Sequence, residues 1–315
     1  MTRNNYKTAM KKIFTNPLYV TLLAILCNFL WGSAYPSVKI GYELFNITDS
    51  VFEKLFFAGL RFMAAGVMVL IVSWLTHRKF PRVSKAGAPY VLLMALIYTA
   101  VQYIFFYVGL SNTSGANGSI VNSIQTFFAV ILAHFVYKDD KLNTRKIIGT
   151  ALGFAGVLAV TMGSGAAQLK LTGEGFILLA ALSFVIGSMI SKKATQTDDA
   201  MSVTGYNLLI GGAVLTAIGV IGGGEFTTVT AAGIGVLAYL SFLSAAAFTI
   251  WTMLLQYNPI GKIAVFNFII PVSGTLLSAV LLGEDIFEVR YLVSLVLVCA
   301  GIVIVNKSKN VKKTG

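Results

Sequence analysis

Long apolar stretches, separated by short polar connections, make up most of this chain. Each stretch is close to the roughly 20 residues that a helix needs to cross the hydrocarbon core of a bilayer. The stretches lie at residues 20 to 40, 52 to 75, 88 to 109, 116 to 137, 146 to 163, 172 to 191, 202 to 221, 231 to 255, 262 to 283 and 289 to 306. The pattern predicts an all-α membrane protein with ten transmembrane helices, and it leaves no stretch long enough for a soluble domain.

A basic arm, residues 1 to 19, precedes the first apolar stretch, and a basic tail, residues 307 to 315, follows the last. The first stretch has no clear small-residue cleavage site, so we expect a retained helix and not a signal peptide. The hydrophobic fraction of 57%, the charged fraction of 11% and the mean hydropathy of +0.80 exclude an ordinary soluble domain.

The distribution of charge bears on topology. A formal net charge of +12 would suggest a nucleic-acid partner in a soluble chain, but here the basic residues occur in short runs between apolar stretches. With the N-terminus placed in the cytoplasm, 19 of the 24 Lys and Arg residues fall on that side, four on the other side and Arg61 within a span. The positive-inside rule therefore predicts that both termini are cytoplasmic. The basic residues are expected to lie at the surface of the lipid bilayer and not to bind nucleic acid.

The two halves of the chain resemble each other. A shift of 145 positions lays residues 110 to 160 on 255 to 305 and pairs Asn122 with Asn267 and Asp140 with Asp285. We therefore expect two repeats, residues 20 to 163 and 172 to 306. Because each repeat has five helices, an odd number, the two must be inverted, which is a recurrent plan of secondary transporters with a substrate site at the repeat interface.

Enzyme signatures are absent from the sequence, which contains no HExxH, GxSxG or Walker loop. The acidic residues all fall in loops or at helix ends, and Cys27 and Cys299 lie inside apolar stretches, where they are typical of packing residues. These observations favour a protein that is not an enzyme, with no cofactor and no metal site. A non-transporting sensor or scaffold, and an enzyme on lipid-linked substrates, remain as alternatives.

Arg61 is the one clearly intramembrane charge, and its insertion costs about 2.5 to 3.5 kcal/mol unless partners satisfy it. It either binds helix-end carbonyls and fixes the second helix, or has an anion-binding or gating role. Pro36 and Pro271 lie within or at the edge of spans, where each removes a backbone donor and favours a bend that is structural or used in gating. Gly149, Gly153 and Gly156 on the fifth helix, and Gly219 with Gly223 on the seventh, predict close helix packing.

Hydrogen-bonding side chains at membrane depth are the candidates for a substrate path, because amides there must face protein or water. The predicted substrate-binding residues are Asn28, Trp31, Tyr98, Gln102, Asn122, Gln125, Trp251 and Asn267. Each could instead provide an interhelical hydrogen bond worth about 1 kcal/mol. Asn122 and Asn267 are the best pair, since the repeat places them at mirrored depths.

The segments NFLWGSAYPSVK in the first span, LRF in the second and YVGLSNTSGANGSIVNSIQTFFAVILAHFVYKDDKL around the fourth carry a family resemblance. FNFIIPVSGTLLSAVLLGEDIF in the second repeat has a proline followed by a Gly-Glu turn, whereas the first repeat has Gln125-Thr126 and Lys138-Asp139 there. Over residues 20 to 306 the chain resembles the drug/metabolite transporter superfamily, specifically its ten-helix EamA-type members.

The resemblance implies a carrier in a bacterial-type cell (cytoplasmic) membrane that exports or exchanges small organic metabolites. It also implies a central cavity lined mainly by the third, fourth, eighth and ninth helices. With aromatic residues beside amides and no acid at membrane depth, we expect an amino-acid-like or amphipathic substrate moved by alternating access. The sequence leaves the substrate, the direction, the coupling ion and homo-oligomer formation open.

Overall fold

A computed structural model describes residues 10–48, 50–138, 140–163, 171–285 and 288–306. The described part is all helical, with no β-strand. The helices are α2 (Pro17–Leu44), α3 (Val51–His77), α4 (Ala88–Met94), α5 (Gln102–Ser111), α6 (Gly115–Asn122), α7 (Ile124–Val136), α8 (Thr144–Gly163), α9 (Phe176–Ala194), α10 (Ala200–Ile221), α11 (Ala231–Tyr257), α12 (Ile260–Ile263), α13 (Ile269–Leu282) and α14 (Val289–Asn306). Three irregular segments continue them: π-helical η1 (Ala95–Val101) and η2 (Leu171–Gly175), and 3₁₀-helical η3 (Ala264–Phe268).

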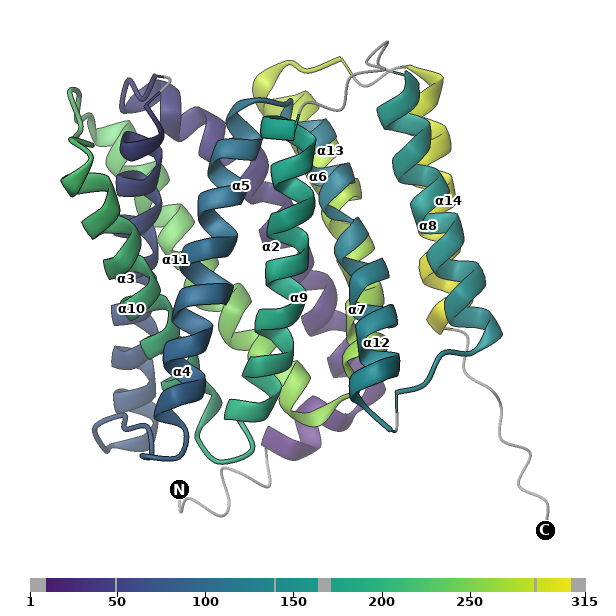
Figure 1. Cartoon of the computed structure of the whole chain (residues 1–315), viewed down its shortest axis with the longest axis horizontal. Helices are drawn as coiled ribbons and strands as arrows, with labels where there is room; N and C mark the ends of the chain where they lie inside the picture. Colours follow the sequence, from purple (N-terminus) through teal and green to yellow (C-terminus); the bar gives the residue numbers. More distant parts are fainter. Residues whose placement is uncertain (1–9, 49, 139, 164–170, 286–287, 307–315) are drawn as a thin grey trace.

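Eight helical segments in the described residues are long and apolar enough to cross a membrane. They are Pro17–Leu44, Val51–His77, Ala88–Ser111, Gly115–Val136, Leu171–Ala194, Ala200–Ile221, Ala231–Tyr257 and Ile260–Leu282. α8 and α14, with 20 and 18 residues, form a further pair that packs together at one side of the bundle (Figure 1). The apolar stretches of the sequence thus correspond to long helices.

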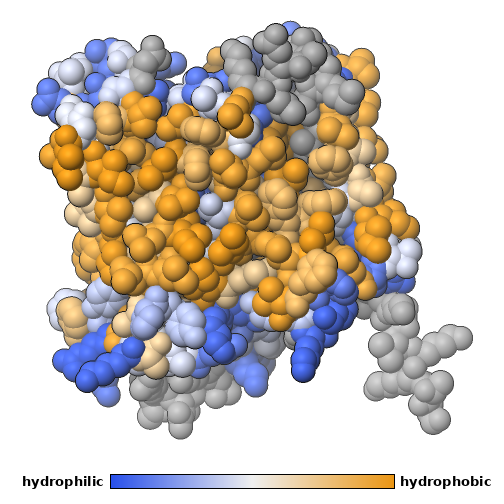
Figure 2. All heavy atoms as spheres, in the orientation of Figure 1, coloured by the Kyte–Doolittle hydropathy of each residue, from blue (hydrophilic) through white to orange (hydrophobic). Residues whose placement is uncertain are grey.

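The outer surface is typical of a protein surrounded by lipid. Figure 2 shows a broad hydrophobic belt between two hydrophilic edges. On α2, large apolar side chains such as Leu18, Leu22 and Leu26 are about half exposed. Such exposure would favour aggregation in water but is the expected arrangement in a bilayer. The chain is therefore a multi-pass membrane protein.

Helix starts follow local capping chemistry. The Asn16 side chain accepts a hydrogen bond from the Leu18 amide, and Pro17 occupies the first turn of α2. Ser50 caps α3 through the Glu53 amide, while the Glu53 carboxylate accepts a hydrogen bond from the Thr48 amide. These side chains satisfy amides that the first helical turn leaves without a partner, so the short connections also define where the helices begin.

Glycines bring α3 and α10 into close contact. A Cβ atom on Gly212 would lie 2.5 Å from the Met63 amide nitrogen, and one on Gly66 would lie 2.5 Å from the Leu209 nitrogen. Small residues allow this backbone approach, which lipid-embedded helices use in place of hydrophobic burial. Gly219 belongs to the same interface, since its Cβ would lie 2.7 Å from the Phe56 nitrogen.

The prediction for Gly223 is wrong, because α10 ends at Ile221 and Gly223 is a turn residue with φ of 80° and no neighbour within 4 Å of its would-be Cβ. Its role is conformational, since this backbone region suits glycine. On α8, a Cβ atom on Gly153 would lie 2.3 Å from the Phe268 ring, so this glycine does permit close packing.

Three membrane-spanning segments depart from regular α-helix within their length. η1 precedes Gln102, a turn at Ser123 separates α6 from α7, and η3 precedes α13. The last two breaks are related by the 145-residue shift, which lays Asn122 on Asn267. Pro271, in the first turn of α13, supplies no backbone donor and favours the break before it. By contrast, α2 continues through Pro36 to Leu44.

Candidate functional site

A cavity lies among the central helices, close to the middle of α2 and α3. Its lining residues are Trp31, Ala34, Tyr35, Arg61, Gln102, Tyr103, Phe106, Asn122, Gln125, Phe184 and Ile270. Its volume is about 30 Å³, which is room for one or two water molecules. The structure therefore represents a closed arrangement, in which a metabolite could enter only after helices move apart.

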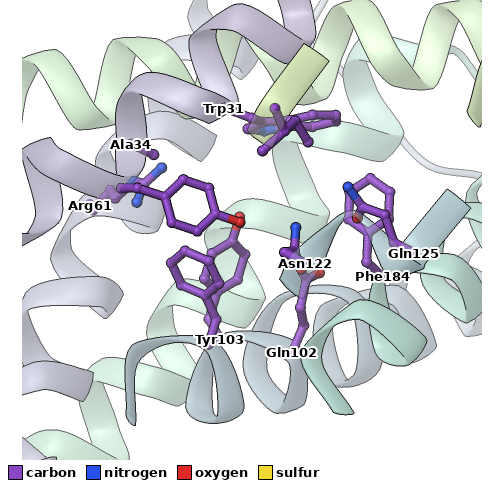
Figure 3. A pocket seen from close by; sticks show the side chains of 11 residues that line it. Trp31, Ala34, Arg61, Gln102, Tyr103, Asn122, Gln125 and Phe184 are labelled. Carbon is purple, nitrogen blue, oxygen red and sulfur yellow. The ribbon is translucent and has the colours of Figure 1, made fainter. Parts of the chain in front are cut away.

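The cavity combines aromatic and polar walls. In Figure 3, Trp31 lies opposite Gln102 and Asn122, and Arg61 and Gln125 lie at opposite sides. The Trp31 ring contacts Phe184 edge to face, with centroids 5.3 Å apart. Such rings can contact apolar ligand groups of different shapes, while the few polar atoms determine how a ligand is oriented.

Arg61 is almost completely buried, with 1% of its surface exposed. Its Nε donates to the Ser244 hydroxyl at 2.8 Å and to the Leu240 carbonyl at 3.2 Å, and Nη1 donates to the Tyr107 hydroxyl at 3.0 Å. These partners come from α11 and α5. The guanidinium is thus held by neutral groups on two neighbouring helices, and Arg61 also lines the cavity, so its position is compatible with more than a packing role.

The amides in the cavity have unused hydrogen-bonding capacity. Gln102 is 6% exposed and its Oε1 has no described partner, and Gln125 is 1% exposed with an unpartnered Nε2. Trp31 Nε1 is also buried without a partner. The Tyr35 hydroxyl, in the same lining, has no described partner either. Buried polar atoms are normally paired, so four unpaired atoms around one cavity indicate that a ligand or water completes them.

Tyr98 and Trp251 do not line the cavity. Trp251 Nε1 donates to the Ser188 hydroxyl at 3.2 Å, and the Ser188 hydroxyl donates to that of Tyr98 at 3.4 Å. The Trp251 ring lies 5.2 Å from that of Trp31, measured between centroids. Both residues therefore support the aromatic wall from behind, a position from which neither contacts a ligand in this arrangement.

Asn28 and Asn267 also lie outside the cavity. The Asn28 side chain is fully buried and donates to the carbonyl of Ala24, one turn earlier in α2, at 2.7 Å. Asn267, in η3, is fully buried, and neither its side-chain nitrogen nor its oxygen has a described partner. Of the eight predicted binding residues, the cavity brings together four: Trp31, Gln102, Asn122 and Gln125.

The expected set of lining helices is partly wrong. The third, fourth and ninth spans contribute, but the eighth span, α11, provides no lining residue, whereas α2, α3 and α9 do. Tyr35, Phe106 and Phe184 line the cavity but were not predicted as site residues. Helical spacing could have found two of them, because Tyr35 follows Trp31 by four positions and Phe106 follows Gln102 by four, which places each pair on one helix face.

Two acidic residues cap helix starts in the opposite half of the chain. Glu284, after α13, accepts hydrogen bonds from the Gly115 and Ala116 amides at 2.9 Å each. Asp140, after α7, accepts one from the Gly261 amide at 2.7 Å and forms an ion pair with Lys146. We call these the two acidic caps. They lie toward opposite ends of the bundle, as the positions of α6 and α12 in Figure 1 show.

Comparison with known proteins identifies the chain's relatives. A model of the EamA-like transporter family matches residues 18–162 and again residues 171–307. The chain is 27% identical over 296 residues to a Salmonella typhimurium protein named "Probable amino-acid metabolite efflux pump", covering 90% of this chain and 93% of that protein. It is 25% identical to the Escherichia coli inner membrane transporter YedA, covering 91% of this chain and 90% of YedA.

A WAT1-related chloroplastic protein of Arabidopsis thaliana is 27% identical over 289 residues, which cover 88% of this chain and 67% of the plant protein. A solved crystal structure with 17% sequence identity superposes with a TM-score of 0.71 over 90% of this chain and 98% of the other. That likeness shows a common fold. The two family matches, together covering most of the sequence, identify the chain as a member of the EamA-like transporter family, a family of membrane transporters and not of enzymes.

Proposed function

We propose that the protein is a secondary transporter that exports or exchanges small organic metabolites, amino-acid-like or amphipathic, by alternating access. The observation that carries this proposal is the small cavity with aromatic walls and unpaired amide groups among helices of both halves. The cavity has the mixed lining of a small-molecule site. The Salmonella relative's name, an amino-acid metabolite efflux pump, agrees with this class of substrate.

The architecture that we propose for this mechanism is ten spans in two inverted five-helix repeats. α8 and α14 would be the fifth and tenth spans beside the eight apolar segments. The breaks at Asn122 and Asn267 support the repeat. We also propose that both termini are cytoplasmic, which the basic residues favour. The described chain begins and ends toward the same edge of the bundle (Figure 1).

The two acidic caps support alternating access because each joins the two halves at a different end of the bundle. The 145-residue shift lays Ala116 on Gly261, and these are the amides that Glu284 and Asp140 bind. In this mechanism, closure of the cavity at either end of the bundle involves a hydrogen bond between a carboxylate of one half and backbone amides at a helix N-terminus of the other half. Release of one contact while the other persists would open the cavity to one side only.

The test is flux in proteoliposomes. Uptake of a labelled metabolite panel would be measured with and without imposed pH and Na⁺ gradients, which also identifies the coupling ion. We expect saturable flux of at least one metabolite that falls in Gln102→Ala and Asn122→Ala. Asn207→Ala is the matched control, since Asn207 is a buried amide outside the cavity that accepts a hydrogen bond from Thr99. Flux no higher than in protein-free vesicles for the whole panel would overturn the proposal.

A further inference from the structure

We propose that the cavity recognises a small monocarboxylate, with Arg61 binding the carboxylate and the aromatic wall of Trp31 and Phe184 holding an apolar part. This inference rests on the proposed function and names the chemistry of its substrate. The carboxylate is the required group, and an amino group on the substrate is not required.

The charge of the cavity is the first reason. No Asp or Glu lines it, and the ion pairs of the described residues lie elsewhere: His77 with Asp199, Lys146 with Asp140, and Arg290 with Glu288. Arg61 therefore brings a positive charge into the membrane interior without a carboxylate beside it in the described chain. Its hydrogen bonds and the Phe62 ring, whose centroid lies 4.9 Å from the guanidinium carbon, satisfy part of this charge but do not neutralise it, so an anionic ligand gains more here than a neutral or cationic one.

The orientation of Arg61 is the second reason. Ser244 and Leu240 hold Nε, Tyr107 holds Nη1, and the described contacts include none for Nη2. The planar guanidinium is thus fixed on one side while donors remain on the other. A guanidinium presents its donors in a fork that matches the two oxygens of a carboxylate, and prior fixation reduces the entropy lost on binding.

The cavity also presents unpaired hydrogen-bond donors to a ligand oxygen. Among the described side chains, Trp31 Nε1 and Gln125 Nε2 are unpaired donors, Gln102 Oε1 is an unpaired acceptor, and the Tyr35 hydroxyl, which is also unpaired, can donate or accept. An ammonium group could donate to Gln102 Oε1 and to the Tyr35 hydroxyl, but it would share the cavity with the guanidinium of Arg61, which has the same charge. A ligand oxygen, by contrast, can be satisfied by several groups. Recognition of an acid is therefore favoured over recognition of an amine.

The experiment compares three probes with one aromatic ring: 3-phenylpropionate, phenylalanine and phenethylamine. They are a carboxylate, a zwitterion and an amine. Binding to the purified full-length protein would be measured by calorimetry and by the ligand-induced rise in melting temperature. We expect the carboxylate to bind at least as tightly as the zwitterion. The dissociation constant of the amine should be about tenfold higher or more, because the amine cannot form the charged hydrogen bond with Arg61.

The variants locate the effect. Arg61→Gln should weaken carboxylate binding about tenfold or more, whereas Arg78→Gln, at the exposed end of the same helix, should leave it unchanged. If Arg61→Gln does not fold, Tyr107→Phe provides a second test. This change removes the hydroxyl that accepts a hydrogen bond from Arg61 Nη1, and Tyr107 does not line the cavity. Because Arg61 stays but is held less firmly, carboxylate affinity should fall by a smaller factor, and amine affinity should stay the same.

Three outcomes overturn the inference: equal binding of the amine and the carboxylate, carboxylate binding that is unchanged in folded Arg61→Gln, or no binding of any carboxylate by the folded protein. None of these depends on flux. A transporter that moves only amines would retain the proposed function and refute this inference, whereas carboxylate binding without flux of any solute would support the inference and refute transport.

Discussion

Asn122 and Asn267 occupy equivalent positions in the two halves of the chain, and the structure places them in different surroundings. Asn122 lies at the end of α6, is partly exposed and lines the cavity. Asn267 lies in η3, is fully buried and has no described partner for either polar atom. Most lining residues come from the first half, and the second half contributes Phe184 and Ile270. Related sequences therefore do not build two equal walls.

The same contrast extends to the two acidic caps. Asp140 is 3% exposed and is paired with Lys146 as well as with the Gly261 amide, whereas Glu284 is half-buried and binds two amides. The asymmetry predicts that the contact at Asp140 is more stable than the contact at Glu284.

Asp140→Ala should destabilise the protein far more than Glu284→Ala. The first removes the carboxylate partner of the partly buried Lys146 ammonium, which retains the Lys141 carbonyl; loss of a partner from a fully buried pair costs about 3–5 kcal/mol, which is the upper figure here. The second removes a helix cap, which costs about 0.5–2 kcal/mol. Melting temperatures in one detergent would rank the variants, and amide hydrogen exchange should increase around Gly261 in the first and around Gly115 in the second. Equal destabilisation would contradict the asymmetry of the caps.

Asn267→Leu should raise the melting temperature, because it removes two buried polar atoms that have no described partners. Each such atom costs about 1–3 kcal/mol when it is left unpaired. The equivalent change at the partly exposed Asn122 should give no such gain. If Asn267→Leu instead lowers stability and flux together, Asn267 has partners in the functional cycle that the closed arrangement lacks, and its predicted role in substrate binding would gain support.

Asn122→Ala should weaken ligand binding by about tenfold, the equivalent of about 1.4 kcal/mol, because a lining amide is lost. Asn267→Ala should leave ligand binding unchanged, because Asn267 does not line the cavity. Calorimetry with 3-phenylpropionate on both proteins measures the difference directly. Equal losses would mean that the two repeats contribute equally to the site, contrary to the cavity as described.

Thr126→Val should have the smallest effect. The Thr126 hydroxyl donates to the carbonyl of Ala264 at 3.0 Å and thereby joins the two interrupted spans. Valine keeps the shape and loses one hydrogen bond, so we expect a loss of about 0.5–1.5 kcal/mol. A control at Thr216, whose hydroxyl donates to the Gly212 carbonyl of its own helix at 2.9 Å and otherwise, among the described residues, only to the weak acceptor Met63 Sδ at 3.4 Å, should show less. A larger effect at Thr216 would mean that the contact between the spans contributes little.

The membrane class, the positions of the long helices and the family could be predicted from the sequence because each depends on local properties. Lipid requires about 20 apolar residues for each span, and caps such as Asn16 and Ser50 act over a few positions. Trp31, Gln102, Asn122 and Gln125 were predicted from polarity alone, and they do line the cavity. The same criterion selected Asn28, Tyr98, Trp251 and Asn267, which do not line the cavity. The polarity of a residue does not determine how its helix is rotated, and so it does not determine whether the side chain faces the cavity.

The sequence by itself determined that this chain is a helical membrane protein of a transporter family. The length of each apolar stretch and the spacing of residues within each motif are local properties that can be observed directly in the sequence. Only the tertiary structure decided which side of Arg61 is occupied by Ser244 and Tyr107, which amides remain unpaired, and that Asp140 and Glu284 each bind the other half. Those contacts join residues 46 to 183 positions apart. They depend on how the helices rotate and pack against one another, which no local pattern encodes.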